Sequence, residues 1–328
     1  MTGILRPEVE DTVSRYTLCL RQAVASAHVT APIKLSPEVA SAIEAGRPVV
    51  ALESTIISHG LPRPRNLEVA LEIEQVVRDA GATPATIALV GGVAHVGLDE
   101  HSLGIIATDN SVVKVSIRDL GIVAARGGHG ATTVAATAHI AALAGIRVFA
   151  AGGLGGVHRD ANVTFDESAD LPALSKLPVT VVCAGVKSIL DVSATLERLE
   201  TLSIPVLAVG TNKFPGFYLT DSGFAIDWSV NSAAEIADIM RAREAFGTEG
   251  GMVIANPLPV TEQLDPALHD RLLKEGLRAA HLRGIRGKDV TPFLLDFFHR
   301  ESKGRSLDVN VTVVLNNARF AAAIASEL

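Results

Sequence analysis

The sequence predicts an α/β protein, a three-layer α/β/α sandwich whose central sheet is mostly parallel. Two observations predict it. Short apolar runs rich in β-branched residues alternate with longer stretches that have helical periodicity, as in chains built from strand–helix–strand units. Glycines follow several of the apolar runs, which suits many strand-to-helix turns. Such sheets bind ligands at the carboxyl ends of their strands, so we expect functional residues directly after predicted strands.

Strands are expected where a short apolar run ends at turn residues, over residues 48–52, 85–90, 112–117, 146–151, 179–183, 204–209 and 251–255. Helices are expected over residues 37–46, 66–80, 135–144, 232–246, 266–283, 291–301 and 306–327, with a short one from residue 118 to the glycines at 127–128. Ser36 and Pro37 are a typical N-cap and first helical residue. Asn66 is expected to cap the second helix, and Gly81 to end it.

The composition favours one large domain. The chain has 328 residues, of which 48% are hydrophobic and only 4% aromatic, so small aliphatic side chains must build the core. No linker divides the chain, and we expect residues 1–33 to form an N-terminal extension and residues 34–328 a single domain. Acidic residues within the extension argue against a transit peptide.

Charge and cysteine content exclude several classes of protein. The formal net charge of -7 argues against a nucleic-acid surface, which needs a basic stripe and usually stacking aromatics. No apolar run approaches the length of a membrane span, so we expect no membrane association. The two cysteines, Cys19 and Cys183, cannot form a disulfide framework and suit the cytoplasm.

A lysine follows a predicted strand that is almost continuously apolar and β-branched. The run 179–183 ends at Ala184 and Gly185, and Lys187 comes two residues later, before a helix-like segment at 188–191. A partly desolvated amine at a strand end can act as a nucleophile. Position alone supports equally well a surface lysine that opens a helix.

A carboxyl follows the strand expected at residues 48–52. Glu53 is surrounded in sequence by apolar residues such as Ile56 and Ile57, and burial there would raise its pKa and suit a general acid. The alternative is a helix-capping or ion-paired glutamate.

Two segments have the character of a phosphate site. Lys114 interrupts an apolar run, as either an edge-strand charge or an anion ligand. Thr132, Thr133 and Val134 open a helix of small residues, where free N–H groups and hydroxyls cradle phosphate well. An ordinary threonine N-cap is the alternative.

A glycine-rich stretch at 152–156 is followed by a short segment rich in polar and charged residues. His158, Asp166 and Asp170 belong to it, and carboxylates at this spacing suit a hard divalent cation that keeps most of its waters. Acidic loop residues that are only solvated give the same pattern.

These residues also carry a resemblance to the pseudouridine-5'-phosphate glycosidase family. It extends from about Leu35 to the C-terminus, through ordered blocks that include VVALESTIISHG from Val49, KVSxRDL from Lys114, GATTVAAT from Gly130, GGLGGVHR from Gly152, FDESADL from Phe165 and VTVVCAGVKSILD from Val179. The resemblance implies that residues 34–328 are one glycosidase-like catalytic domain. It implies reversible cleavage of the C–C glycosidic bond of pseudouridine 5'-phosphate with water, giving uracil and ribose 5-phosphate in pseudouridine catabolism.

The resemblance also implies roles for particular residues. Lys187 corresponds to the nucleophile that forms a covalent adduct with ring-opened ribose, Glu53 to the proton donor, and Asp166 to the ligand of one Mn²⁺ per subunit. Substrate contacts are expected from Lys114, Thr132, Thr133, Val134, His158, Ser168, Ala169, Asp170 and Asn310. The family tends to form homotrimers.

Three other functions are weighed against this one. A Schiff-base aldolase-type lyase also needs a strand-end lysine and a phosphate site, but would cleave sugar phosphates that carry no base. A non-catalytic nucleotide-binding or assembly protein would have no need of Glu53, Lys114, Asp166 and Lys187 together. A dehydrogenase is disfavoured, because the glycines at 152–156 lack the spacing of a dinucleotide-binding loop.

Overall fold

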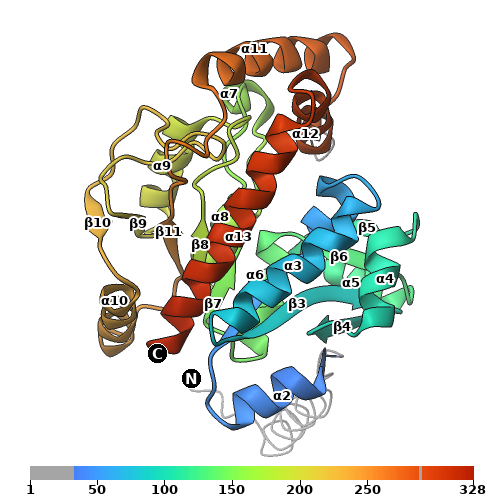
Figure 1. The fold of residues 1–328 in the computed structure, drawn as a ribbon, viewed down its shortest axis with the longest axis vertical. Coiled ribbons are helices and arrows are strands. Elements are labelled where there is room, and N and C mark those ends of the chain that lie inside the picture. The colour runs from blue at the N-terminus through green and yellow to red at the C-terminus, as the bar shows by residue number, and fades with distance from the viewer. Residues whose placement is uncertain (1–32, 288–289) are drawn as a thin grey trace, which may run out of the picture. The chain divides into compact units, whose positions relative to one another are not determined.

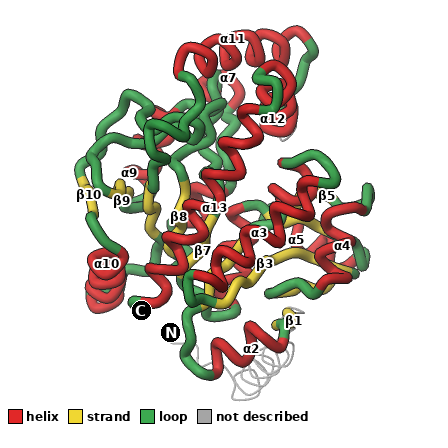
Figure 2. Tube along the Cα trace, viewed as in Figure 1, coloured by secondary structure: helices red, strands yellow, loops and turns green. Residues whose placement is uncertain are grey.

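A mostly parallel sheet runs through the described part of the chain, with helices on both of its faces (Figures 1 and 2). The computed structural model describes residues 33–287 and 290–328, within a unit that extends from Ile33 to Leu328. The strands are β1 (Ile33–Leu35), β2 (Val49–Leu52), β3 (Thr83–Val90), β4 (Val93–Val96), β5 (Val113–Val115), β6 (Gly130–Thr132), β7 (Val148–Ala150), β8 (Thr180–Cys183), β9 (Val206–Val209), β10 (Trp228–Val230) and β11 (Met252–Ala255).

Their order in the sheet is β1-β4-β3-β2-β7-β8-β11-β9-β10, with β6 paired to β3 and β5 paired to β6. Only the pairs β3–β4 and β3–β6 are antiparallel. The predicted α/β class with a mostly parallel sheet is therefore confirmed. The expected N-terminal extension lies outside the described residues, apart from β1, which pairs with β4 and was not predicted.

The helices are α2 (Pro37–Glu44), α3 (Arg65–Asp79), α4 (Glu100–Thr108), α5 (Ile117–Ala125), α6 (Val134–Leu143), α7 (Ala161–Thr164), α8 (Asp170–Leu174), α9 (Val192–Thr201), α10 (Ala233–Ala245), α11 (Pro266–Leu282), α12 (Val290–Glu301) and α13 (Arg305–Ser326). A one-turn π-helix, η1 (Ile56–Gly60), follows β2. Strand residues alternate between two buried clusters. Ala51 packs with α2, α5, α6 and α9, whereas Val50 packs with α3, α10 and α13. This alternation places one helical layer on each face of the sheet.

Most helix starts follow from capping. The Ser36 hydroxyl accepts the Val39 N–H at 3.2 Å, as the sequence predicts. The predicted cap at Asn66 is wrong, because α3 already begins at Arg65. The amide of Asn66 instead donates to the carbonyl oxygens of Ile57 and Ala107, at 2.8 and 2.9 Å, and so ties η1 to α4.

Gly91 and Gly92 both have positive φ and form a tight hairpin turn after β3, and β4 returns antiparallel to β3. Two local predictions fail at turns. Residues 130–132 form the strand β6, and α6 starts only at Val134. The segment 188–191 is a turn, and α9 begins at Val192, capped by Asp191.

The last helix anchors the sheet next to the end of β7. Although its β-branched run lowers helix propensity, α13 is continuous and packs against β2, β7 and β8. The Asn317 amide donates to the Ala151 carbonyl at 2.9 Å, and its oxygen accepts from Asn256 at 3.1 Å. These buried contacts fix the main chain where the glycine-rich loop begins.

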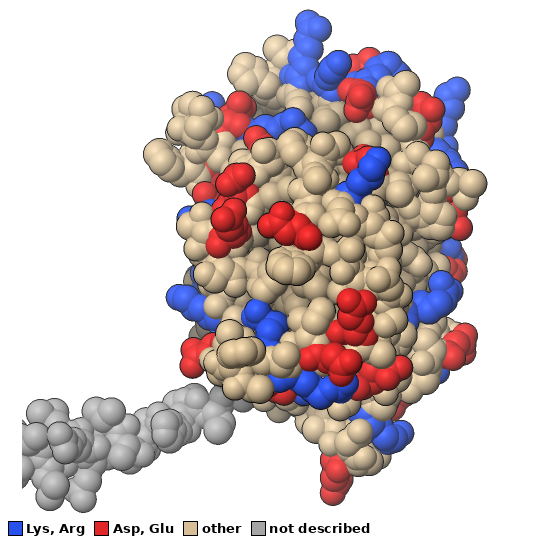
Figure 3. All heavy atoms as spheres, turned by 90° about the vertical axis from the view of Figure 1, so that its left-hand side faces the viewer, with Lys and Arg blue, Asp and Glu red and all other residues tan. Residues whose placement is uncertain are grey.

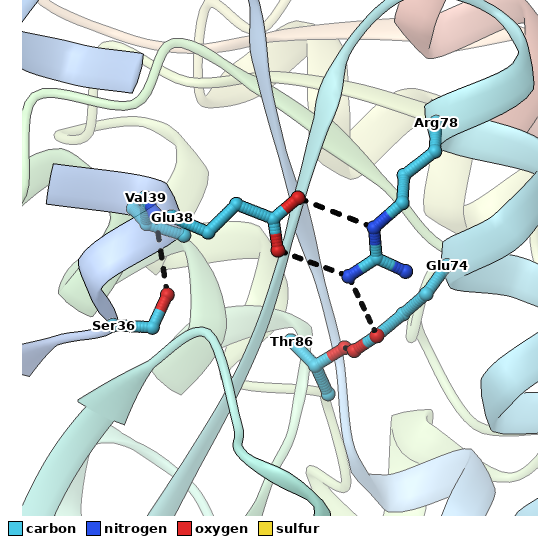
Figure 4. Close-up of polar contacts among 6 residues, drawn as sticks. All are labelled: Ser36, Glu38, Val39, Glu74, Arg78 and Thr86. Atoms are coloured by element: carbon cyan, nitrogen blue, oxygen red, sulfur yellow. Dashed lines mark hydrogen bonds and ion pairs between the residues drawn. The ribbon is translucent and has the colours of Figure 1, made fainter. Parts of the chain in front are cut away.

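A polar network joins α2, α3 and β3 away from that loop (Figure 4). Arg78 contacts Glu38 at 3.0 Å and the buried Glu74 at 3.4 Å. Thr86 donates to the other oxygen of Glu74 at 2.6 Å. Burial raises the pKa of Glu74, while these two partners favour its charged form. The network therefore has a structural explanation without a ligand.

The exterior carries charges of both signs on the face that Figure 3 shows. Basic and acidic side chains are interspersed there, and the described residues form no continuous basic stripe on it. Across residues 33–287 and 290–328, no helix is both long and apolar enough to span a membrane.

Candidate active site

Two adjoining cavities lie at the carboxyl ends of β2, β7 and β8. The inner cavity is a narrow space of about 40 Å³, whose walls include Glu53, Gly153, Lys187, Phe217 and Asn310. The outer cavity, of about 360 Å³, opens from it. Glu53, Thr55, Lys114, Lys187 and Thr291 line both spaces. Segments far apart in sequence thus meet at the sheet edge where the sequence predicts a ligand site.

Glu53 directly follows β2 and is only partly exposed. Burial raises its pKa above the ordinary carboxyl value, although the nearby charges of Lys187 and Lys114 act in the opposite direction. A raised pKa moves a carboxyl in the direction that a general acid requires.

Lys187 lies in the turn after β8 and does not open a helix. Its N–H donates to the Leu154 carbonyl at 3.1 Å, and its own carbonyl accepts from Leu190 at 2.9 Å. The side chain passes close to Gly153, where an added Cβ would lie 3.3 Å from Lys187 Cγ and 2.6 Å from a ring carbon of Phe217. The glycine is therefore needed for close packing around the lysine.

Asp170 positions the main chain of both cavity walls. Its carboxylate accepts the N–H groups of Gly155 and Ala135, each at 2.9 Å. Ser168 supports this arrangement, because its hydroxyl accepts the Asp170 N–H at 3.2 Å. Asp170, Ser168 and Ala169 line the outer cavity, as expected, but both oxygens of the Asp170 carboxylate are already engaged by backbone donors.

The three residues predicted at the start of α6 separate into two environments. Thr133 is the N-cap and lines the outer cavity together with Val134, at the positive end of the helix dipole, although the Ala135 and Ala136 N–H groups are already bound by Asp170 and Thr133. Thr132 is different. Its hydroxyl donates to the Ile87 carbonyl at 2.6 Å and accepts from Thr137 at 2.8 Å, and the residue is fully buried. The structure thus directs its side chain into the core and not into the cavity.

His158 and Asp166 face each other on the outer cavity, with 3.8 Å between Nδ1 and a carboxylate oxygen. Burial lowers the pKa of His158. The charge of Asp166 opposes this effect, while those of Lys114 and Lys187 add to it. Among the described residues, no three or more His, Cys, Asp or Glu side chains gather around one point. Glu167 is ion-paired to Arg198 at 2.9 Å, which leaves Asp166 as the available carboxylate.

The inner cavity is closed by Phe217 and by Asn310 of α13. Phe217 has a left-handed backbone, with φ at 63°, and stacks edge-on against Tyr218 with 4.6 Å between the ring centres. Phe217 lines the inner cavity. Phe214 is in the core. Asn310 is buried, and its side-chain oxygen lies 3.7 Å from where a Cβ on Gly152 would be.

Sequence reasoning missed several residues of the cavity walls. Thr55 and His59 follow Glu53 within the same motif, and Arg118 follows Lys114. Their closeness in sequence to a predicted site residue is the signal that could have identified them. Thr291, Pro292 and Leu295 come from α12, and no local pattern points to them.

Comparison with known proteins identifies this arrangement. Residues 38–327 match the family model described as Indigoidine synthase A like protein. The chain belongs to this family. Among curated relatives, the pseudouridine-5'-phosphate glycosidase of Salinispora tropica is 57% identical over 326 residues, covering 99% of this chain and 98% of that protein. The enzyme of the same name from Deinococcus radiodurans is 50% identical and covers 90% of this chain and 94% of its own.

Two solved structures of the indigoidine synthase A-like kind have the same fold. One is the prealnumycin C-glycosynthase AlnA in complex with ribulose 5-phosphate, with a TM-score of 0.83 and 36% identity, covering 90% of this chain and 96% of that one. The other is an indigoidine synthase A-like protein from Thermotoga maritima, with a TM-score of 0.83 and 34% identity, covering 92% and 98%. The resemblance that the motifs indicate is therefore confirmed.

Proposed function

We propose that this indigoidine synthase A-like protein is a pseudouridine-5'-phosphate glycosidase. It splits pseudouridine 5'-phosphate reversibly, with water, into uracil and ribose 5-phosphate, in pseudouridine catabolism. The names of its relatives support this activity. One observation of the structure carries the proposal. Glu53, with a raised pKa, and Lys187 line one small inner cavity, which opens into a larger cavity whose walls include Lys114 and Arg118.

The chemistry needs these two groups because the scissile bond joins two carbons. Protonation of a glycosidic oxygen, the usual device of glycosidases, is unavailable. The amine of Lys187 bonds to C1' as the ring C1'–O4' bond opens. The C1'–C5 bond then breaks, and its electron pair stays on the base carbon, which takes a proton. Glu53 handles the protons of these steps. Water adds to the remaining iminium, which frees the lysine and ribose 5-phosphate.

The outer cavity provides for the phosphate. The groups of this cavity that attract an anion are Lys114, Arg118 at the rim and the N-terminus of α6 at Thr133 and Val134. When the phosphate is bound in the outer cavity, C1' and the base occupy the inner cavity. This division supports a phosphorylated nucleoside as substrate over the free nucleoside.

We propose Mn²⁺ as the metal, one ion per subunit, held by Asp166 and water. The donor set fits, because one carboxylate on a hydrated cavity wall suits a hard cation that keeps most of its waters. When bound, such an ion would organise the polar atoms of the uracil through ordered waters. The resemblance further supports a homotrimer in the cytoplasm.

The test is uracil release. Purified protein is mixed with pseudouridine 5'-phosphate and Mn²⁺, and uracil is followed by chromatography, with and without a chelator. We expect release that the chelator suppresses and that Asp166→Ala loses, while the neighbouring Glu167→Ala keeps it. Release that ignores the chelator would retain the glycosidase and contradict the metal site. No release, together with cleavage of sugar phosphates that carry no base, would instead favour the aldolase-type lyase.

A further inference from the structure

A third cavity lies beside the inner cavity, between η1, α12 and α13. This side chamber has a volume of about 220 Å³, and its polar wall residues include Ser58, His59, Tyr218, His299, Ser306 and Asn310. Five residues also line the inner cavity and form the partition between the two spaces: His59, Gly60, Pro292, Leu295 and Asn310. The chamber is several times larger than the roughly 30 Å³ that one water molecule occupies.

The walls of the side chamber carry unused hydrogen-bonding groups. Ser58 Oγ, His59 Nε2 and His299 Nδ1 are buried and have no hydrogen-bond partner among the described residues. Buried polar groups of a folded protein are normally paired, because leaving one unpaired costs about 1–3 kcal/mol. Three such groups in the walls of one cavity favour polar contents, water or a polar ligand, over apolar contents.

The charge of the chamber differs from that of the outer cavity. Lys114, Arg118 and Lys187 line the outer cavity, whereas the described walls of the side chamber hold no lysine or arginine. Its only carboxylate, Asp296, is ion-paired with Arg300 at 2.9 Å. Burial and the charge of Lys114 lower the pKa of His59, so its ring is neutral near pH 7. Hydroxyl, imidazole and amide groups without net charge suit a neutral ligand that both donates and accepts hydrogen bonds.

We propose that the side chamber is a second binding site for a free pyrimidine base, separate from the position in the inner cavity where the base is joined to C1'. A uracil ring offers two N–H groups and two carbonyls, which match donors and acceptors of this kind. The proposal rests on the proposed function. After the C1'–C5 bond breaks, the released base moves away from C1' into this second site while the sugar is still bonded to Lys187.

The test fills the inner cavity first. Lys187→Ala protein is saturated with pseudouridine 5'-phosphate, which it should bind without turnover, and ¹⁴C-uracil binding is measured by equilibrium dialysis. We expect about one further uracil per subunit. Adding Ser58→Leu, which fills the chamber, should weaken uracil binding at least tenfold and leave pseudouridine 5'-phosphate affinity unchanged. Ser111→Leu, an exposed serine on the surface, is the matched control and should change neither.

Folding of each variant is checked by its melting temperature. If Ser58→Leu fails to fold, His299→Leu tests the same wall. Uracil that is displaced competitively by pseudouridine 5'-phosphate would mean a single base site, and uracil that never binds would mean a chamber filled only with water. Either result would overturn the proposal. Failure of the proposed function looks different, because the protein would then not bind pseudouridine 5'-phosphate but would still bind one uracil sensitive to Ser58→Leu.

Discussion

Asp170 holds the main chain of Gly155 in place, with its carboxylate 2.9 Å from the Gly155 N–H. Its second oxygen accepts from Ala135 in the first turn of α6. One buried carboxylate therefore joins the glycine-rich loop to the predicted phosphate cradle. An added Cβ on Gly155 would lie 2.5 Å from the Asp170 oxygen that accepts the Gly155 N–H. This hydrogen bond therefore requires glycine at position 155.

Asp170→Asn should test this positioning role. An asparagine amide can present only one acceptor oxygen, so one backbone N–H is left facing a donor, at a cost of roughly 1–3 kcal/mol. We expect a lower melting temperature together with a lower kcat/KM. Asp238→Asn, on the exposed surface of α10, should change neither. Lost activity at an unchanged melting temperature would indicate instead that Asp170 acts on the substrate directly.

Gly153→Ala should impair turnover by displacing Phe217 and the stem of Lys187. The new Cβ would approach the Phe217 ring to 2.6 Å, which is too close for van der Waals contact. We expect kcat/KM to fall about tenfold or more, a barrier change of about 1.4 kcal/mol. The control is Gly104→Ala, inside α4 with open space at Cβ, which should stabilise the protein slightly and keep its activity. Equal activity of the two variants would argue against close packing at Lys187.

Lys114→Gln should weaken phosphate recognition and also change a neighbouring titration. Lys114 contributes to the lowered pKa of His158, so its neutralisation should raise that pKa in an NMR titration. We expect a KM for pseudouridine 5'-phosphate at least tenfold higher and less sensitive to salt. Lys274→Gln, exposed on α11, is the charge-matched control. An unchanged KM would remove Lys114 from the phosphate site.

Sequence patterns were sufficient for most strands and for the residues that end them, but not for β1, β4, β6 and β10. Glu53 and Lys187 directly follow buried apolar runs, and in a parallel sheet the ends of neighbouring strands meet at one edge. Their meeting in one cavity was therefore predictable. The long helices were equally predictable, because capping residues and periodicity agree along them.

The failures come from side-chain direction and from distant contacts. Thr132 and Thr133 are adjacent, yet one ends a strand with its side chain in the core and the other caps a helix on the cavity. Reading the segment as helix throughout could not separate them. His59 and His299 meet at the side chamber only because α12 packs against η1, and no local pattern encodes that contact.

Glu53→Gln should remove the general acid, lowering kcat by about 100- to 10,000-fold. The same substitution should also change the stability of the protein, in a way that depends on pH. Since the folded pKa of Glu53 lies above its ordinary value of 4.5, the folded state binds more protons than the unfolded state over that window, and the contribution of Glu53 to stability falls as pH rises. The melting temperature of Glu53→Gln, measured relative to that of the wild type, should therefore rise between acid and neutral pH. A gain towards acid pH would contradict the raised pKa.

The most direct test of the central claim is a covalent trap at Lys187. The enzyme is incubated with ribose 5-phosphate and borohydride, and peptides are mapped by mass spectrometry. A reduced ribose 5-phosphate adduct on Lys187, absent from Lys187→Arg and unaffected by Lys274→Gln, is the result that the proposed mechanism predicts. Uracil release by the same preparation with no adduct at Lys187, or with the adduct on another lysine, would contradict it.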